Sequence, residues 1–283
     1  AWQDINRAYK SGLELFERGK FGSAAKQFDR VEELRTKTSL QLDETEELLL
    51  IKENVRFYQA VCALELDDTN AESQLLKYIK DFPASANAKA AYFQIGRSYY
   101  AKKDYPAAIA WFTKIDANNL AGAEGQEYRF KLGYSYFMTN DYKAAKPLFD
   151  KLKDERSQYQ EASIYYFAYL CYLDAEYKTA LNEFERLNGS KTFENSYPYY
   201  ITALYFLDKR YDDVLSYALP ILKTTKQEHE TDMFRIIAAT YFIKGDLALS
   251  KDYYDKFQAL DQGKTQNNQD SYHSILESRK CRS

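Results

Sequence analysis

The chain has 283 residues and is nearly neutral, since 39 Lys and Arg residues stand against 42 Asp and Glu residues. A nucleic-acid-binding surface needs a basic excess on one face, so this balance argues against that function. No apolar run reaches the roughly 18 residues that a membrane-spanning helix needs. Two His and three Cys leave little for metal or thiol chemistry, whereas 27 Tyr and 17 Phe make the chain rich in rings. We therefore expect aromatic side chains, rather than catalytic groups, to carry the function.

A short sequence phrase recurs along the chain. It reads Lys-Phe-Gly-Ser-Ala at residues 20–24, Asp-Tyr-Pro-Ala-Ala at 104–108, Asp-Tyr-Lys-Ala-Ala at 141–145 and Glu-Tyr-Lys-Thr-Ala at 176–180. Weaker copies stand at 210–214 and 246–250. From Tyr105 onward, the aromatic residue or Leu that marks the phrase returns after 37, 35, 34 and 36 residues. Such a period indicates a repeat protein.

Each unit is predicted to hold a first helix, a short polar turn and a second helix that starts at the marker. Apolar residues recur at i, i+3, i+4 and i+7, the spacing of a helix with one buried face. Leu48 to Ile51 have the composition of a buried segment, so we expect residues 44–51 to lengthen a helix. The predicted units are 5–38, 44–84, 85–120, 123–157, 158–190, 194–226 and 229–260, with a capping helix at 268–280.

Small residues in the middle of the first helices have a packing reason. Gly12, Gly96 and Gly133 allow a neighbouring helix to approach closely, and a large partner fills the gap. Together with the period, the order aromatic, Leu, Gly, Tyr, Ala, Phe resembles the tetratricopeptide repeat family over residues from about 5 to 260. This resemblance implies an all-α fold, with 1–283 forming a single α-solenoid of about seven helix pairs.

Residues that could carry chemistry are scattered. His229 lies between two Glu residues, but no second His or Cys stands at metal-ligand spacing, so we interpret it as a solvated helix start. Cys62 and Cys171 occupy the same place in the second and fifth units and are expected to be inert core thiols. We therefore predict a protein that is not an enzyme and that has no cofactor and no metal.

The first helices also carry large residues on the side opposite their core stripe. These residues stand one, five and eight places after the first large residue of each unit. They are Phe93, Arg97 and Tyr100; Phe130, Tyr134 and Phe137; Tyr165, Tyr169 and Tyr172; Tyr199, Ala203 and Phe206; and Arg235, Ala239 and Phe242.

In the tetratricopeptide repeat family this second face lines the concave groove, where peptides or partner helices lie. The resemblance therefore implies a partner-binding groove, and aromatic residues suit such an interface. Arg97 and Arg235 are candidate anchors for an acidic group. The alternative is that the rings pack between adjacent first helices, as we expect for Tyr100 and Phe137. The candidate groove residues are Phe93, Arg97, Phe130, Tyr134, Tyr165, Tyr169, Tyr199 and Arg235.

We predict a non-enzymatic scaffold that binds a peptide, an extended segment or a helix of a protein partner. Residues 81–85, Asp-Phe-Pro-Ala-Ser, resemble the linker of bacterial cell-envelope tetratricopeptide proteins of the BamD-like type. That resemblance implies a periplasmic or outer-membrane-associated scaffold in a membrane-associated assembly complex. Two alternatives stay open: a glycan-binding or peptidoglycan-binding module, and a regulatory or sensor domain of a larger cytoplasmic protein. Because the sequence begins with Ala1, we expect that an N-terminal segment has been removed.

Overall fold

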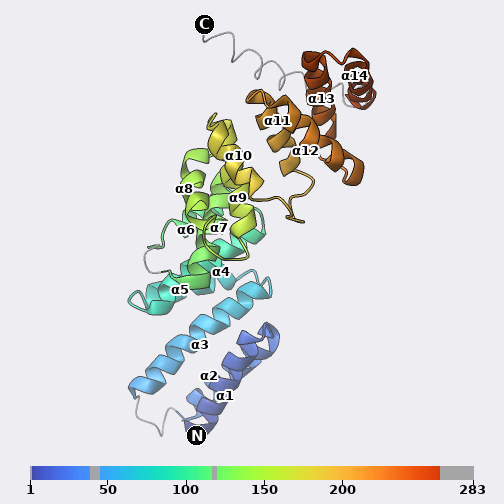
Figure 1. Ribbon diagram of the computed structural model, residues 1–283. Coiled ribbons are helices and arrows are strands. Elements are labelled where there is room, and N and C mark those ends of the chain that lie inside the picture. The colour runs from blue at the N-terminus through green and yellow to red at the C-terminus, as the bar shows by residue number, and fades with distance from the viewer. Residues whose placement is uncertain (1, 39–44, 117–119, 262–283) are drawn as a thin grey trace. The chain divides into compact units, whose positions relative to one another are not determined.

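The computed structural model describes residues 2–38, 45–116 and 120–261 (Figure 1). Over these ranges the regular elements are α-helices, with no strand among them, so the predicted all-α fold is confirmed. The helices are α1 Trp2–Glu17, α2 Phe21–Thr38, α3 Glu46–Glu65, α4 Ala71–Asp81, α5 Ala86–Ala101, α6 Tyr105–Phe112, α7 Gly122–Met138, α8 Tyr142–Leu152, α9 Gln160–Leu173, α10 Tyr177–Glu185, α11 Tyr197–Leu207, α12 Tyr211–Thr224, α13 Glu230–Lys244 and α14 Leu247–Asp261.

Helices pack in pairs along the sequence. The chain divides into two compact units, residues 1–148 and 149–283, with the boundary inside α8. In the first unit α1 packs on α2, α3 on α4 and α5 on α6, and each pair also contacts the next. In the second unit the same holds for α9 with α10, α11 with α12 and α13 with α14. The predicted capping helix at 268–280 lies outside the described residues.

The turn inside each helix pair has the same backbone geometry seven times. One residue of each turn has φ between 56° and 86°, and the amide of the next residue donates to the carbonyl oxygen five positions earlier. This pattern is the Schellman motif, which satisfies carbonyl groups at a helix end. The residues with positive φ are Gly19, Asp67, Lys103, Asn140, Ala175, Lys209 and Gly245.

The Asp of the recurring phrase begins the second helix of a pair. Oδ1 of Asp104 accepts from the amide of Ala107 at 3.1 Å, and Asp141 and Asp246 accept in the same way from the amides three residues on. An N-cap side chain of this kind satisfies an amide that has no partner within the helix. The phrase is therefore a stop signal for one helix followed by a start signal for the next.

At Gly12 and Gly96, small positions of the first helices, a large partner fills the gap, as predicted, and it is a phenylalanine in both. A Cβ atom added to Gly12 would lie 2.6 Å from the ring of Phe28, and one added to Gly96 would lie 2.6 Å from the ring of Phe112. Both rings are completely buried. Glycine is needed here for close approach, since any side chain would overlap the ring.

Two predictions about the second repeat have different outcomes. Residues 46–65 form one long helix, as expected. Within the apolar run 48–51, Leu48 and Ile51 are buried, whereas Leu49 and Leu50 are exposed. The prediction that the whole run is buried is wrong because α3 turns just one face to its neighbours. Cys62 is a buried free thiol, as predicted, and burial raises its pKa to about 11. None of the described helices has the length and apolar character that crossing a bilayer requires.

Candidate partner-binding face

In the first unit, Tyr134 on α7 lies at the centre of a group of half-buried rings. It meets Tyr100 of α5 and Tyr105 of α6 edge to face, with ring centroids 5.9 and 5.8 Å apart. It also stacks against Phe130 and Phe137 of its own helix, at 6.1 and 6.4 Å. We call these five residues the Tyr134 cluster. Each keeps part of its surface exposed, so the cluster offers apolar area to a ligand.

A polar hollow adjoins the Tyr134 cluster. The carboxylate of Glu127 forms ion pairs with Arg97 Nε at 2.9 Å and with Lys131 Nζ at 2.6 Å. Lys131 Nζ also lies 5.2 Å from the ring centre of Tyr100. The hollow has a volume of about 400 Å³ and carries both signs of charge on its walls. Groups of both signs suit the main chain and polar side chains of a peptide. The lining residues are Leu64, Glu65, Asp67, Gln94, Arg97, Ser98, Ala101, Lys102 and Lys131.

Phe93 does not belong to this surface. It is only 3% exposed and packs in the core against Phe112 and Tyr128, with ring centroids 5.9 and 6.4 Å away. The prediction that Phe93 lines the groove is wrong because the position next to the core stripe still falls within the buried arc of α5. Phe130, one repeat later, occupies the corresponding place and stays half-buried.

In the second unit a cluster of tyrosines joins α9 to α11. Tyr200 lies at its centre and is 7% exposed. Its ring meets Tyr169 at 5.6 Å, Tyr172 at 5.4 Å and Tyr165 at 6.3 Å, all edge to face. Tyr199 lies beside it at 5.1 Å. We call Tyr165, Tyr169, Tyr172, Tyr199 and Tyr200 the tyrosine cluster.

Four hydroxyl groups of the tyrosine cluster, those of Tyr165, Tyr172, Tyr199 and Tyr200, stay protonated at neutral pH. Burial raises the pKa of Tyr165, Tyr172, Tyr199 and Tyr200, because a buried phenolate loses its hydration. Protonated hydroxyls both donate and accept hydrogen bonds, so they can orient a polar ligand. Tyr200 is not among the predicted site residues, because it does not stand at one of the three places per repeat that define the predicted face.

His229 and Arg235 extend the tyrosine cluster onto α13. His229 is the N-cap of α13 and its side chain is 38% exposed, as predicted for a solvated helix start, but its ring also lies 4.6 Å from that of Tyr199. His229 Nδ1 and Arg235 Nη2 both lie 3.8 Å from the carboxylate of Asp232. Burial lowers the pKa of Arg235, although the guanidinium remains charged at neutral pH. Sequence spacing alone could not place His229 on a ring from another repeat.

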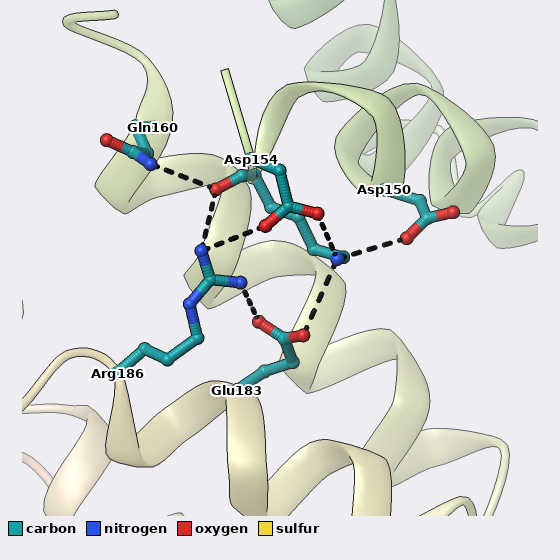
Figure 2. Close-up of polar contacts among 6 residues, drawn as sticks. Asp150, Asp154, Gln160, Glu183 and Arg186 are labelled. Carbon is teal, nitrogen blue, oxygen red and sulfur yellow. Dashed lines mark hydrogen bonds and ion pairs between the residues drawn. The ribbon is translucent and has the colours of Figure 1, made fainter. Parts of the chain in front are cut away.

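A separate charged cluster ties α9 and α10 to the end of α8 (Figure 2). Lys153 Nζ reaches Asp150 at 3.5 Å, Asp154 at 2.7 Å and Glu183 at 3.5 Å. Arg186 binds Asp154 and Glu183 and donates to the carbonyl oxygen of Lys153. Every charge drawn in Figure 2 has an opposite partner, so we assign the cluster a structural role.

The predicted groove residues therefore fall into two groups, one in each unit. Arg97, Phe130 and Tyr134 are part of the face of the first unit, and Phe93 is not. Tyr165, Tyr169, Tyr199 and Arg235 are half-buried in the second unit.

Within residues 2–38, 45–116 and 120–261, no group of three or more His, Cys, Asp and Glu side chains is placed to hold a metal ion.

Comparison with known proteins identifies the repeat. Residues 69–119 and 127–159 each match a family model described as tetratricopeptide repeat. Comparison with curated proteins gives no match. Among solved structures, MamA AMB-1 covers 63% of this chain and 94% of its own, with 16% identity and a TM-score of 0.54. The apo form of RapI covers 95% of this chain and 79% of its own, with 18% identity and a TM-score of 0.53.

A tetratricopeptide repeat protein from Parabacteroides merdae covers 97% of this chain and 98% of its own, with 12% identity and a TM-score of 0.48. The likeness to MamA and RapI confirms the predicted all-α solenoid fold, and the family-model matches identify tetratricopeptide repeats at residues 69–119 and 127–159. The resemblance of residues 81–85 to cell-envelope proteins stays a prediction.

Proposed function

We propose that this protein is a scaffold that holds a peptide segment or helix of a partner protein on the exposed faces of its first helices. The repeat architecture supports a role in protein interaction. The observation that carries the proposal is the Tyr134 cluster beside the polar hollow. Apolar ring surface next to paired charges is the composition of a protein-binding surface, where aromatic anchors supply most of the affinity.

The ring arrangement favours a peptide over a sugar. A sugar stacks on the open face of an aromatic ring, but Phe130 and Phe137 already stack against Tyr134, with interplanar angles of 20° and 25°. In the second unit Phe193 stacks on Tyr165 with centroids 4.5 Å apart. The faces of Tyr134 and Tyr165 that contact these rings are therefore closed to a sugar. Partly exposed rings with hydroxyl groups suit apolar side chains and the amide groups of a peptide.

The proposal is tested with a double variant that changes one ring in each unit. Tyr134→Ala with Tyr169→Ala should abolish capture of the partner from an extract of the source organism, because each cluster loses one of its rings. The wild-type chain should retain the partner after crosslinking. Circular dichroism of the variant should still show native helicity, so that lost binding is not lost folding.

A matched control changes two exposed residues of second helices. Leu76 on α4 and Leu260 on α14 are each 41% exposed, one in each unit. Leu76→Ala with Leu260→Ala should capture the partner as the wild type does. Equal capture by the Tyr134/Tyr169 variant would contradict the proposal and assign the rings to packing.

We further propose the cell-envelope setting that residues 81–85 suggest. Fractionation of source cells, followed by detection of the protein in periplasmic, membrane and cytoplasmic fractions, tests this setting. A protein confined to the cytoplasmic fraction would contradict it and would favour a sensor or regulatory domain. The binding proposal does not depend on this outcome.

A further inference from the structure

The turn that follows α10 carries the one Asn-Gly pair of the sequence, Asn188 and Gly189. Both residues are exposed. Gly189 has φ of 92°, and a Cβ atom added to it would meet nothing within 4 Å. Asparagine is among the chemically labile residues of proteins, and a following glycine, which has no Cβ atom, hinders attack on its side chain least. The turn is therefore open to a reaction between these two residues.

The amide nitrogen of Gly189 is the nucleophile that such a reaction needs. Its neighbours in the turn are held, since the amide of Asn188 donates to the carbonyl oxygen of Glu185 at 3.1 Å and that of Ser190 donates to Leu187 at 2.8 Å. In the part of the chain that the structure describes, no hydrogen bond uses the amide of Gly189. No hydrogen bond therefore has to break before this nitrogen approaches the side chain of Asn188.

Other turns protect their asparagines. In the turns at Asn70, Asn140 and Asn195, the amide of the next residue donates to a main-chain carbonyl oxygen, at 3.1, 2.9 and 2.9 Å. The remaining asparagines of the described ranges lie within helices, and they are Asn6, Asn54, Asn87 and Asn182. Asn188 thus combines the most reactive sequence with an amide that is not hydrogen bonded.

A change at Asn188 would act on the contact between α10 and α12. Its Oδ1 accepts a hydrogen bond from the Tyr217 hydroxyl at 3.3 Å, across 29 positions. The ring of Tyr217 meets that of Tyr205 edge to face at 5.9 Å, and the Tyr205 hydroxyl donates to Glu185 at 2.6 Å. A carboxylate at position 188 would add a second negative charge to this group, where it would repel that of Glu185.

We propose that Asn188 deamidates spontaneously because its turn leaves the amide of Gly189 without a hydrogen bond. The Gly189 nitrogen forms a bond to Cγ of Asn188 and loses its proton, while the side-chain nitrogen leaves as ammonia. Water then opens the succinimide ring at either of its two carbonyl groups and leaves aspartate or isoaspartate. The net reaction consumes one water, releases one ammonia and gives the turn a negative charge. This inference is independent of the proposed partner binding.

Peptide mapping by mass spectrometry of the full-length chain, aged in mildly alkaline buffer, tests the proposal. The peptide that contains Asn188 should change from the mass of an amide to that of an acid at least about tenfold faster than those that contain Asn140 or Asn195, where a turn hydrogen bond must break first. Asn188→Gln should keep its amide, because the longer side chain closes a larger ring more slowly. An Asn188 peptide that keeps its amide as long as those of Asn140 and Asn195 would overturn the proposal.

A second variant separates the structure of the turn from its sequence. Asp141→Gly places glycine after Asn140, in a turn where the amide of residue 141 donates to the carbonyl oxygen of Tyr136. Glycine is tolerated at an N-cap, so α8 should keep its fold. Asn140 of this variant should still react several-fold more slowly than Asn188 of the same molecule. Equal rates at the two positions would overturn the proposal, since the sequence alone would then set the rate.

Discussion

Two glycines of the first helices, Gly12 and Gly96, lie directly on phenylalanine rings of the second helices. The contact explains why the repeat needs Gly at a position where helix propensity disfavours it. The helix loses up to about 1 kcal/mol of intrinsic stability through Gly and gains a close-packed interface. Phe28 therefore requires glycine at position 12, and Phe112 requires glycine at position 96.

Gly96→Ala should destabilise the first unit by about 1–3 kcal/mol, because the new methyl group would lie 2.6 Å from the ring of Phe112. Urea denaturation followed by circular dichroism measures the change. Gly22→Ala is the matched control, since a Cβ atom there meets nothing within 4 Å. This control should be neutral or slightly stabilising. A loss no greater for Gly96→Ala than for Gly22→Ala would contradict the packing described here.

Ala175→Gly should stabilise the chain by about 0.5–1 kcal/mol. Ala175 has φ of 60° in the turn between α9 and α10, a conformation that costs an L-residue roughly 1 kcal/mol and costs glycine nothing. Thermal unfolding measures the effect. Ala259→Gly, at an exposed helical position of α14, should instead lose about 1 kcal/mol. If both variants lose stability alike, the turn is not strained.

At the scale of helices, hydrogen bonds between serine and glutamate tie successive elements together. Ser85, the N-cap of α5, bonds to Glu53 of α3 across 32 positions. Ser190 bonds to Glu161 of α9 at 2.8 Å across 29 positions, and Ser196 bonds to Glu228 at 2.7 Å across 32. These separations are close to one repeat length, so each bond holds one helix pair against its neighbour. Charged hydrogen bonds of this kind are stronger than neutral ones.

The cluster around Lys153 makes stability depend on pH in a defined direction. The hydrogen bond from Lys153 lowers the pKa of Asp154 below 3.8, and the same bond raises the pKa of Lys153 above 10.5. A carboxyl group with a lowered pKa stabilises the fold above its unfolded pKa and loses this effect as pH falls. A lysine with a raised pKa stabilises below its unfolded pKa and loses this effect as pH rises. The contribution is therefore complete between about pH 4 and pH 10.

Lys153→Met should destabilise the second unit by about 1–2 kcal/mol at pH 7, because Asp154 and Glu183 lose their shared cation. The difference from the wild type should shrink at pH 3, because a carboxyl group with a lowered pKa loses its stabilising effect as pH falls below its unfolded pKa. Denaturation curves at both pH values measure this. Lys251→Met, which removes an exposed lysine paired only with Asp255 among the ion pairs described, should have no measurable effect. A difference that does not change with pH would contradict the assignment.

Within each of the two units, helix pairs contact their neighbours in sequence, as in other repeat proteins. The period of the phrase was enough to predict the helix pairs, because Asp at an N-cap, a turn with positive φ and Gly facing Phe recur together. Local rules repeated many times therefore predicted the fold.

The candidate site could be predicted only in part. Tyr134 and Tyr169 lie where the helical spacing places them, half-buried among other rings. Phe93 is buried, and Tyr200 and His229 join the second cluster, because their positions depend on how helices of different repeats pack. Spacing within one helix defines a face but not the depth at which a neighbouring helix buries it. This limit follows from the close packing of protein interiors.

The most direct test of the binding account is photo-crosslinking in source cells from single positions that carry a photoreactive phenylalanine. Placed at Tyr134 or at Tyr169, the probe should crosslink to the same partner protein, and placed at Leu76 of α4 it should not. Peptide mapping of the crosslinked product should give one partner segment for each position. Crosslinks from Leu76 as strong as those from Tyr134 and Tyr169 would show that the partner lies on the second helices and would contradict the account.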